Sequence, residues 1–207
     1  MTSGVTEDAE RPAPGVARPP GRPRRAEVDE AILAAAVDLF AEGGLDGLTV
    51  EGVAARANVG KATIYRRYPC KVDLVIAASK LFTVDGDGVL PDTGTTRGDL
   101  RVLVDWVIAM LTTTPLGRAL PMMVSDRARV PELADAHREM MAEKRARHRA
   151  ALQRGVDRGD LRADADLELM IDSYVGPIFY RFLITDAPLD DAFADELVEH
   201  TLRAFSA

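Results

Sequence analysis

The chain contains a single cysteine among its 207 residues, which excludes an internal disulfide and a zinc site built on several cysteines. No apolar run approaches the roughly 18 residues that a membrane-spanning helix needs, and the N-terminus lacks the apolar core of a secretory signal. We therefore expect a cytoplasmic protein without a membrane partner. No nucleophile-base pair, phosphate-binding loop or metal-ligand cluster is recognisable, so the sequence predicts no catalytic site, no cofactor and no metal.

The net charge of -7 conceals an uneven distribution of charged residues. Residues 1–10 carry three acids and no base, whereas residues 11–71 carry ten bases and seven acids. The remaining residues, 72–207, carry 16 bases and 23 acids. Attraction to phosphates depends on the charge of the contacting surface, so the basic excess near the N-terminal end is compatible with a nucleic-acid partner.

Residues 1–25 combine five prolines with little apolar content, which predicts a disordered segment. The end of this segment is basic because it contains Arg18, Arg22, Arg24 and Arg25. Two interpretations stay open. The segment is either an arm that enters a DNA minor groove beside the main site or a solubilising tail with diffuse attraction to DNA.

The stretch 49–68, TVEGVAARANVGKATIYRRY, predicts two short helices joined by a tight turn. Thr49 supplies a hydroxyl that can accept a backbone N–H at the start of the first helix. Asn58 tolerates a left-handed backbone, and Gly60 directly precedes the second helix. That helix is predicted over residues 61–68 because Pro69 prevents its easy continuation. The pattern is typical of a helix-turn-helix.

The outer face of the second helix is predicted to be basic and polar. Ile64 should point into a core, and the residues left outside are Lys61, Thr63, Tyr65, Arg66 and Arg67. Basic groups attract phosphates, and Ala62 lets the backbone approach a groove closely. On the turn alone, an ordinary helical hairpin with a solvated basic face remains the alternative.

The wider segment from Glu27 to Ser79 resembles the TetR family of one-component transcriptional regulators. The matching features are Leu39-Phe40 before a glycine-rich turn, Thr49, Thr63-Ile64-Tyr65 with Tyr68, and Lys71 at the start of a fourth helix. The resemblance implies an all-α homodimer. It would have a three-helix helix-turn-helix head over residues 26–84, with the motif at 49–68, and a helical ligand-binding and dimerisation body over residues 97–207.

By position, the resemblance implies roles for eight residues in binding double-stranded DNA. Lys61, Ala62 and Arg66 would lie nearest the base edges. The phosphate contacts would come from Thr49, Thr63, Tyr65, Arg67 and Lys71. Three positions depart from the family pattern, because Asn58 replaces the usual Gly of the turn, Gly60 the usual Ser cap, and Cys70 the usual small residue before Lys71. These departures affect details of docking rather than the class of protein.

Apolar periodicity predicts further helices over residues 27–42, 71–84, 99–113, 131–156, 164–185 and 188–205. A shorter one over 116–124 is interrupted by Pro121, and Gly176-Pro177 should kink the 164–185 helix. The basic run from Lys144 to Arg154 is interpreted as a solvated face, because Glu139 and Glu143 precede it at helical spacing. In the family the last two helices pair with their copies in a homodimer. An intrachain core is the alternative.

The resemblance implies an effector pocket in the body. If their helices surround it, seven aromatic and methionine residues would line it: Trp106, Met110, Met122, Met123, Tyr174, Phe179 and Tyr180. Such a cavity suits an uncharged, lipophilic or partly aromatic ligand. The same residue types at helical spacing also form ordinary cores. The sequence thus predicts a ligand-released homodimeric repressor that binds a palindromic operator. The alternatives are a small-molecule carrier or helical enzyme with a vestigial head, and a structural DNA protein without sensing.

Overall fold

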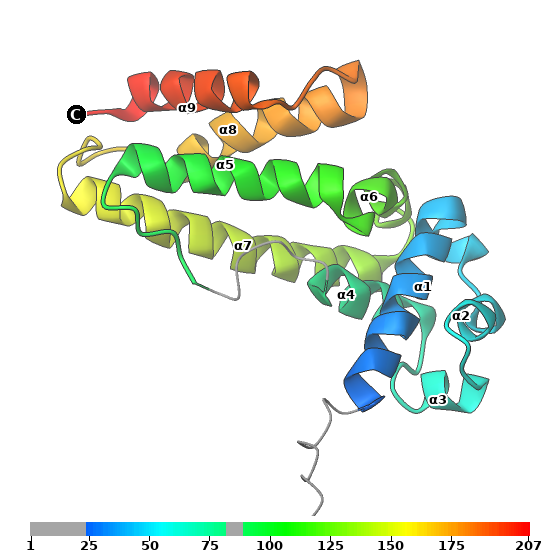
Figure 1. The fold of residues 1–207 in the computed structure, drawn as a ribbon. Coiled ribbons are helices and arrows are strands. Elements are labelled where there is room, and N and C mark those ends of the chain that lie inside the picture. The colour runs from blue at the N-terminus through cyan, green and yellow to red at the C-terminus, as the bar shows by residue number, and fades with distance from the viewer. Residues whose placement is uncertain (1–23, 82–88) are drawn as a thin grey trace, which may run out of the picture.

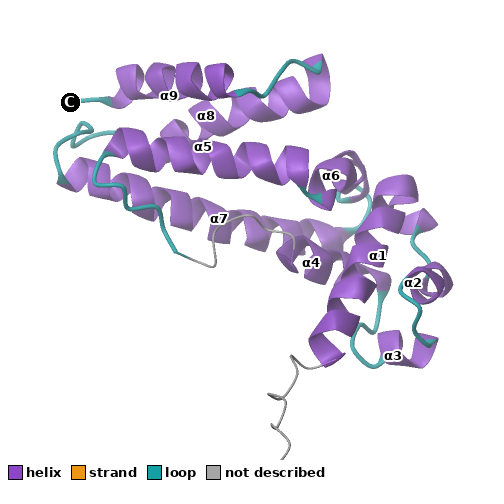
Figure 2. Ribbon diagram, viewed as in Figure 1, coloured by secondary structure: helices purple, strands orange, loops and turns teal. Residues whose placement is uncertain are grey.

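The computed structural model describes residues 24–81 and 89–207. Within these ranges the regular elements are helices, and Figure 2 shows no strand among them. The all-α prediction is confirmed. The arm predicted over residues 1–25 lies outside the described residues, except that the backbone of Arg24 and Arg25 already belongs to the first helix.

The head is built from α1 (Arg24–Gly47), α2 (Val50–Arg56) and α3 (Lys61–Tyr65), and α4 (Lys71–Leu81) leads toward the body (Figure 1). The regular part of α1 ends at Glu42, as predicted, because Gly43 and Gly44 have non-helical backbone angles. Apolar side chains from all four helices meet in one core, which includes Ile32, Phe40, Val53, Ile64 and Leu74.

The body contains α5 (Thr96–Thr113), α6 (Pro115–Asp126), α7 (Pro131–Asp157), α8 (Leu167–Tyr180), the π-helical turn η2 (Arg181–Thr185) and α9 (Asp191–Phe205). In Figure 1, α5 and α7 run side by side, and α8 and α9 pack above α5 in this view. A second core joins these helices through Leu100, Leu103, Leu152, Met170 and Ile178.

Three body helices begin at capping residues rather than where the apolar periodicity begins. The hydroxyl of Thr95 accepts the Gly98 N–H, so α5 starts earlier than predicted. Asp166 and Asp190 likewise accept backbone N–H groups, so α8 and α9 start later than predicted. A side-chain acceptor satisfies an N–H that has no partner inside the helix, and this local bond fixes the first turn.

Two prolines lie inside helices without ending them. α6 continues through Pro121, which is exposed, while Ala119 and Met123 are buried in the core. This burial offsets the lost hydrogen bond, so the predicted interruption is wrong. α8 continues through Pro177, and the irregular part is η2, after Tyr180, rather than Gly176-Pro177.

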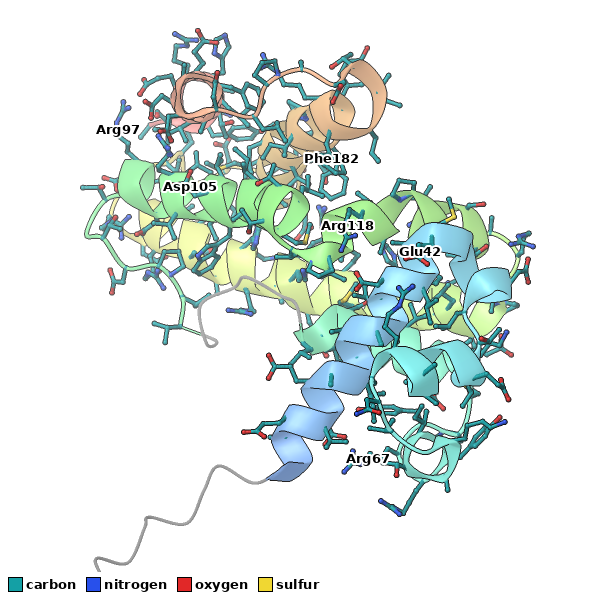
Figure 3. The ribbon with its side chains drawn as sticks, turned by 45° about the vertical axis from the view of Figure 1, so that its right-hand side comes forward. Glu42, Arg67, Arg97, Asp105, Arg118 and Phe182 are labelled. Carbon is teal, nitrogen blue, oxygen red and sulfur yellow. The ribbon has the colours of Figure 1, made fainter. Side chains whose placement is uncertain are left out.

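Head and body are joined mainly where α6 packs against α1. Figure 3 shows Arg118 at this junction, and its Nη2 lies 2.7 Å from the Asp38 carboxylate on α1. At the other end of α6, the buried Asp126 accepts a hydrogen bond from the Leu45 N–H at 2.7 Å. Met123 of α6 and Leu133 of α7 belong to the head core. The two units therefore share one packed interface.

Candidate nucleic-acid interface and effector cavity

The turn between α2 and α3 has the backbone that its sequence predicts. The Thr49 hydroxyl accepts the Gly52 N–H at 3.0 Å and begins α2. Asn58 adopts a left-handed conformation with φ of 54°, which asparagine tolerates better than most residues. Gly60 begins α3 from an extended backbone without a side-chain hydrogen bond. The two short helices are thereby turned so that α3 lies at the outer end of the head (Figure 1).

Most residues of α3 and the residue that follows it are exposed. Lys61, Ala62, Tyr65 and Arg66 are exposed, Thr63 is half-buried, and Ile64 is completely buried in the head core. The ammonium of Lys61 lies 2.9 Å from the Glu51 carboxylate of α2, and this hydrogen bond raises the pKa of Lys61. Both side chains are more than half exposed, so this ion pair adds little stability and can yield to a phosphate.

Arg67 differs from its expected outward position. Its guanidinium lies 2.6 Å from the Asp29 carboxylate of α1, and 15% of its side chain is exposed. Figure 3 shows Arg67 between α3 and α1. α3 ends at Tyr65 rather than at Tyr68, but the N–H groups of Arg67 and Tyr68 still donate to the Ile64 carbonyl. Arg67 follows the buried Ile64 by three positions, so it lies on the same inward face of this helical course. The ion pair of Arg67 with Asp29 therefore holds the turn after α3 against α1.

Lys71, at the start of α4, donates a hydrogen bond from its ammonium to the Leu45 carbonyl at 3.2 Å. The N–H of the same residue, Leu45, is held by Asp126. The main chain of the last turn of α1 thus forms hydrogen bonds with both α4 and α6. Thr49 is exposed, and its hydroxyl can still donate to a phosphate while it accepts the Gly52 N–H.

A cavity of about 660 Å³ lies between head and body. Its wall includes Val37 and Phe40 of α1 and Val75 and Ser79 of α4. The remaining wall comes from α5, α6, α7, α8 and η2. The volume falls within the range that small-molecule sites occupy, and the apolar wall with a few polar groups has their usual composition.

The seven residues expected at an effector cavity divide into two groups. Met110, Met123 and Phe179 line it. The other four are not part of its wall: Trp106 packs against the body core, Met122 packs against the head core, Tyr180 is 59% exposed, and Tyr174 is fully buried. The Tyr174 hydroxyl lies 2.6 Å from His148 Nδ1, and burial raises the pKa of this phenol.

The described residues contain neither a metal-ligand cluster nor a single helix that could span a membrane. Residues 24–81 and 89–207 hold no group of three His, Cys, Asp or Glu side chains that could bind a metal ion. In the same ranges, no single helix is long and apolar enough to cross a membrane. Only α5 and α6 taken together reach that composition, and they are bent by 86°.

Comparison with known proteins identifies both units. Residues 32–78 match the family described as bacterial regulatory proteins, tetR family, and residues 90–201 match the tetracyclin repressor-like C-terminal domain. The uncharacterized HTH-type transcriptional regulator YdeS of Bacillus subtilis is 35% identical over 188 residues, which cover 90% of this chain and 94% of YdeS. This chain belongs to the TetR family. It is therefore a helix-turn-helix transcriptional regulator.

Two other relatives of this TetR-family regulator extend the comparison. The DNA-binding transcriptional repressor TetR of Mycobacteroides abscessus is 32% identical over 177 residues, covering 83% of this chain and 90% of that protein. The crystal structure of the TetR family transcription regulator SCO0332 superposes with a TM-score of 0.63 at 32% identity. That alignment covers 86% of this chain and 97% of the other.

Several residues that shape the site of this TetR-family regulator had no recognisable signal in the sequence. Asp29 and Asp126 look like ordinary surface acids, yet one pairs with Arg67 and the other, 3% exposed, holds the Leu45 N–H. His137 and Lys144 belong to the polar pattern of α7 but line the cavity. Only the packing of α6 and α7 against α1 and α4 brings them to these places.

Proposed function

We propose that the protein is a homodimeric repressor that binds a palindromic operator and releases it when an effector enters the cavity. The observation that carries this proposal is the shared wall of the cavity, which combines α1 and α4 of the head with helices of the body. A ligand there contacts both units at once. It shifts the head only through a difference in affinity between two arrangements, so effector and operator weaken each other reciprocally.

In this proposal α3 enters the major groove, with Lys61, Ala62 and Arg66 nearest the base edges. Thr49, Thr63 and Tyr65 contact phosphates from the edges of the same surface. Arg67 and Lys71 hold protein groups, Asp29 and the Leu45 carbonyl. They contribute mainly by fixing α3 against α1 and α4, and each reaches a phosphate only by leaving that partner.

The proposed dimer face lies on α8 and η2. Four large apolar side chains are exposed there, although α8 is a core helix: Leu169, Tyr180, Leu183 and Ile184. A second copy of the chain would cover them, because a monomer in water would leave this patch exposed. The two copies of α3 would then lie in successive major grooves ~34 Å apart. The M. abscessus relative is named a repressor, so we propose repression rather than activation. The proposed site of action is the cytoplasm.

The test is selection of bound fragments from the source genome by the purified full chain at two salt concentrations. We expect enrichment of one palindrome, with a neighbouring gene whose transcription rises when the regulator is removed. Uniform enrichment at both salt concentrations would show a non-specific DNA protein instead. Retention of fragments by a variant lacking the α3 charges would be equally contrary to the proposal.

A variant pair makes the same experiment specific to α3. Arg66→Ala should change the preferred sequence, because an arginine that reads a base discriminates by about 1–3 kcal/mol. Arg162→Ala removes an exposed arginine between α7 and α8, away from the head, and should leave the preference unchanged. A uniform loss of affinity in Arg66→Ala would assign this residue to phosphate binding.

A further inference from the structure

His137 of α7 lies where three hollows of the molecule meet. It lines the main cavity, a small hollow between α4 and α7, and a more open pocket between the end of α6 and the start of α7. The residue is partly buried, so its ring is neither sealed in a core nor fully in solvent. The imidazole therefore brings polar atoms to the junction between α4, α6 and α7.

The partner of His137 determines which ring nitrogen carries the proton. Arg127 Nη1, just after the end of α6, lies 3.4 Å from His137 Nδ1. A guanidinium can only donate, so Nδ1 accepts and the proton of the neutral ring is on Nε2. Burial lowers the pKa of His137, and the positive charges of Arg127 and Lys144 lower it further, so the ring is neutral at neutral pH. The wall thus contains a neutral imidazole with one N–H donor.

The N–H on Nε2 has no acceptor in the part of the chain that the structure describes. Over residues 24–81 and 89–207, the contact with Arg127 is the one hydrogen bond of this imidazole. In the empty cavity water can accept from Nε2, but a ligand that fills the cavity displaces this water. A donor left unpaired in this way is unfavourable. A ligand that offers an acceptor at this position avoids that loss.

Other polar side chains of the wall have partners within the protein. The Ser79 hydroxyl donates to a carbonyl of its own helix at 2.8 Å, and the Asp172 carboxylate lies 2.6 Å from the Arg145 guanidinium. Lys144 Nζ lies 3.6 Å from Met110 Sδ, and this lysine takes part in a further interaction as well. The imidazole N–H is therefore a donor that a neutral ligand can use without breaking a contact within the protein.

We propose that the effector is a neutral, largely apolar molecule with a carbonyl group, whose oxygen accepts a hydrogen bond from His137 Nε2. This proposal rests on the proposed function and adds one acceptor to the uncharged ligand that the residue types predict. The surrounding wall is apolar, with Phe40, Phe179 and four methionines, and low polarity strengthens a hydrogen bond. Methionine side chains adapt to varied ligand shapes. The site therefore selects the position of the carbonyl more strictly than the outline of the ligand.

Benzophenone and diphenylmethane test the acceptor, because they share two phenyl rings and differ at the carbonyl oxygen. Isothermal titration calorimetry measures the binding of each to the full chain and to His137→Leu. His137→Leu should weaken benzophenone by about fivefold, as the loss of one hydrogen bond would. It should not weaken diphenylmethane. Equal weakening of both ligands would show that His137 only packs in the wall, and an unchanged affinity for benzophenone, or no binding of it to the wild type, would overturn the contact.

Two further variants separate hydrogen bonding from general effects. His137→Gln keeps a donor at this position and should retain more affinity for benzophenone than His137→Leu. His200→Leu is the matched control, because His200 is an exposed histidine of α9 that lines a different pocket. This control should bind both ligands as the wild type does, and circular dichroism checks that each variant remains helical. Equal losses in His200→Leu and His137→Leu would overturn the assignment of His137.

Ultraviolet illumination of bound benzophenone reports where its carbonyl lies. The excited carbonyl takes a hydrogen atom from a neighbouring C–H, and the two radicals combine in a carbon–carbon bond. Met140 and Met141 line the cavity three and four positions after His137, so they share its face of α7. Mass spectrometry of the digested protein should find the adduct on these methionines. Adducts confined to Phe179 and Leu183, on the opposite helices, would place the carbonyl elsewhere and overturn the proposal.

Diphenylacetate tests whether the ligand is neutral, because it carries a carboxylate on the same two rings. It should bind more weakly than benzophenone, since an anion loses more hydration than a ketone on entering an apolar cavity. Tighter binding of diphenylacetate would overturn the neutral class of ligand.

Operator selection without ligand separates these results from the proposed function. A protein that selects a palindrome but shows no dependence of benzophenone binding on His137 remains a repressor with a different effector. A protein whose benzophenone binding depends on His137 but that selects no DNA keeps the carbonyl site and loses the regulatory role.

Discussion

The Asp126 carboxylate accepts a hydrogen bond from the Leu45 N–H at 2.7 Å, although the two residues are 81 positions apart in the chain. Asp126 ends α6, which lines the cavity, and Leu45 lies in the last turn of α1, after the bend at Gly43-Gly44. Asp126 also pairs with the Arg129 guanidinium. This hydrogen bond joins the end of α6 to the main chain of the head.

Asp126→Ala should lower the free energy of unfolding by about 1–3 kcal/mol, because it leaves a buried N–H without an acceptor. Asp46→Ala is the control. Asp46 lies near the same Arg129 guanidinium, at 3.5 Å, but 85% of its side chain is exposed. Urea denaturation of both variants checks the difference, and similar midpoints for the two would contradict the structural role of Asp126.

Gly44→Ala should be destabilising, whereas Gly43→Ala should be tolerated. Gly44 has φ of 60°, and a Cβ there would lie 2.6 Å from Asp126 Oδ2. A left-handed alanine costs of order 1–3 kcal/mol before this clash is counted. Gly43 has φ of -150°, and a Cβ there meets nothing within 4 Å. Thermal denaturation of the two variants measures the contrast, and a stable Gly44→Ala would place the bend of α1 elsewhere.

Arg67→Ala and Lys61→Ala should separate stability from DNA binding within one motif. Arg67→Ala should lower stability by about 1–2 kcal/mol, less than for a fully buried pair, because Asp29 and Arg67 keep some exposure. A double-mutant cycle with Asp29→Ala checks the pairing.

Lys61→Ala should leave stability nearly unchanged and lower the salt dependence of DNA binding, because it removes a positive charge from the face that displaces counterions from the DNA. Fluorescence anisotropy with the selected operator at several salt concentrations provides this measurement. An unchanged slope would mean that Lys61 keeps its partner Glu51 in the complex.

His137 should make stability depend on pH. Its folded-state pKa is lowered from 6.5 by burial and by Arg127 and Lys144, so the unfolded chain takes up the proton first. Its contribution to the free energy of unfolding is complete above pH 6.5 and is lost as the pH falls through the folded-state pKa. His137→Gln should remove this decline. Parallel melting temperatures for wild type and variant across that range would contradict it.

Local chemistry explains which features could be predicted from the sequence. Thr49, Asn58 and Gly60 act through their own backbone angles or through bonds within three residues, so their roles follow from residue type. The end of α3 was misplaced because Tyr65 to Tyr68 permits a helix or a turn, and packing against α1 decides. The expected direction of Arg67 was wrong for another reason: its charge favoured an outward assignment, although it follows the buried Ile64 by three positions and shares its face.

The cavity was only partly predictable for a different reason. By residue type, Trp106 and Tyr180 are as good candidates for the cavity wall as Met110 and Phe179. Only the way in which the helices cross determines which of these side chains line the cavity. Phe40 and Val75 belong to the head by sequence and gave no indication that they also form part of the wall. Polar α7 residues such as Lys144 were predicted to lie on a solvated face, because charge spacing along a helix does not distinguish such a face from the polar part of a cavity wall.

Leu45 contributes both of its peptide groups to the joint, its N–H to Asp126 of α6 and its carbonyl to Lys71 of α4. Every amino acid except proline offers the same two groups. The head therefore contributes only main-chain groups of residue 45 to these two hydrogen bonds. The apolar side chain at this position can vary, within the limits of its packing, without breaking them. Most substitutions at position 45 therefore keep both hydrogen bonds, as long as Asp126 and Lys71 remain, whereas a proline there would remove the donor and break the bond to α6.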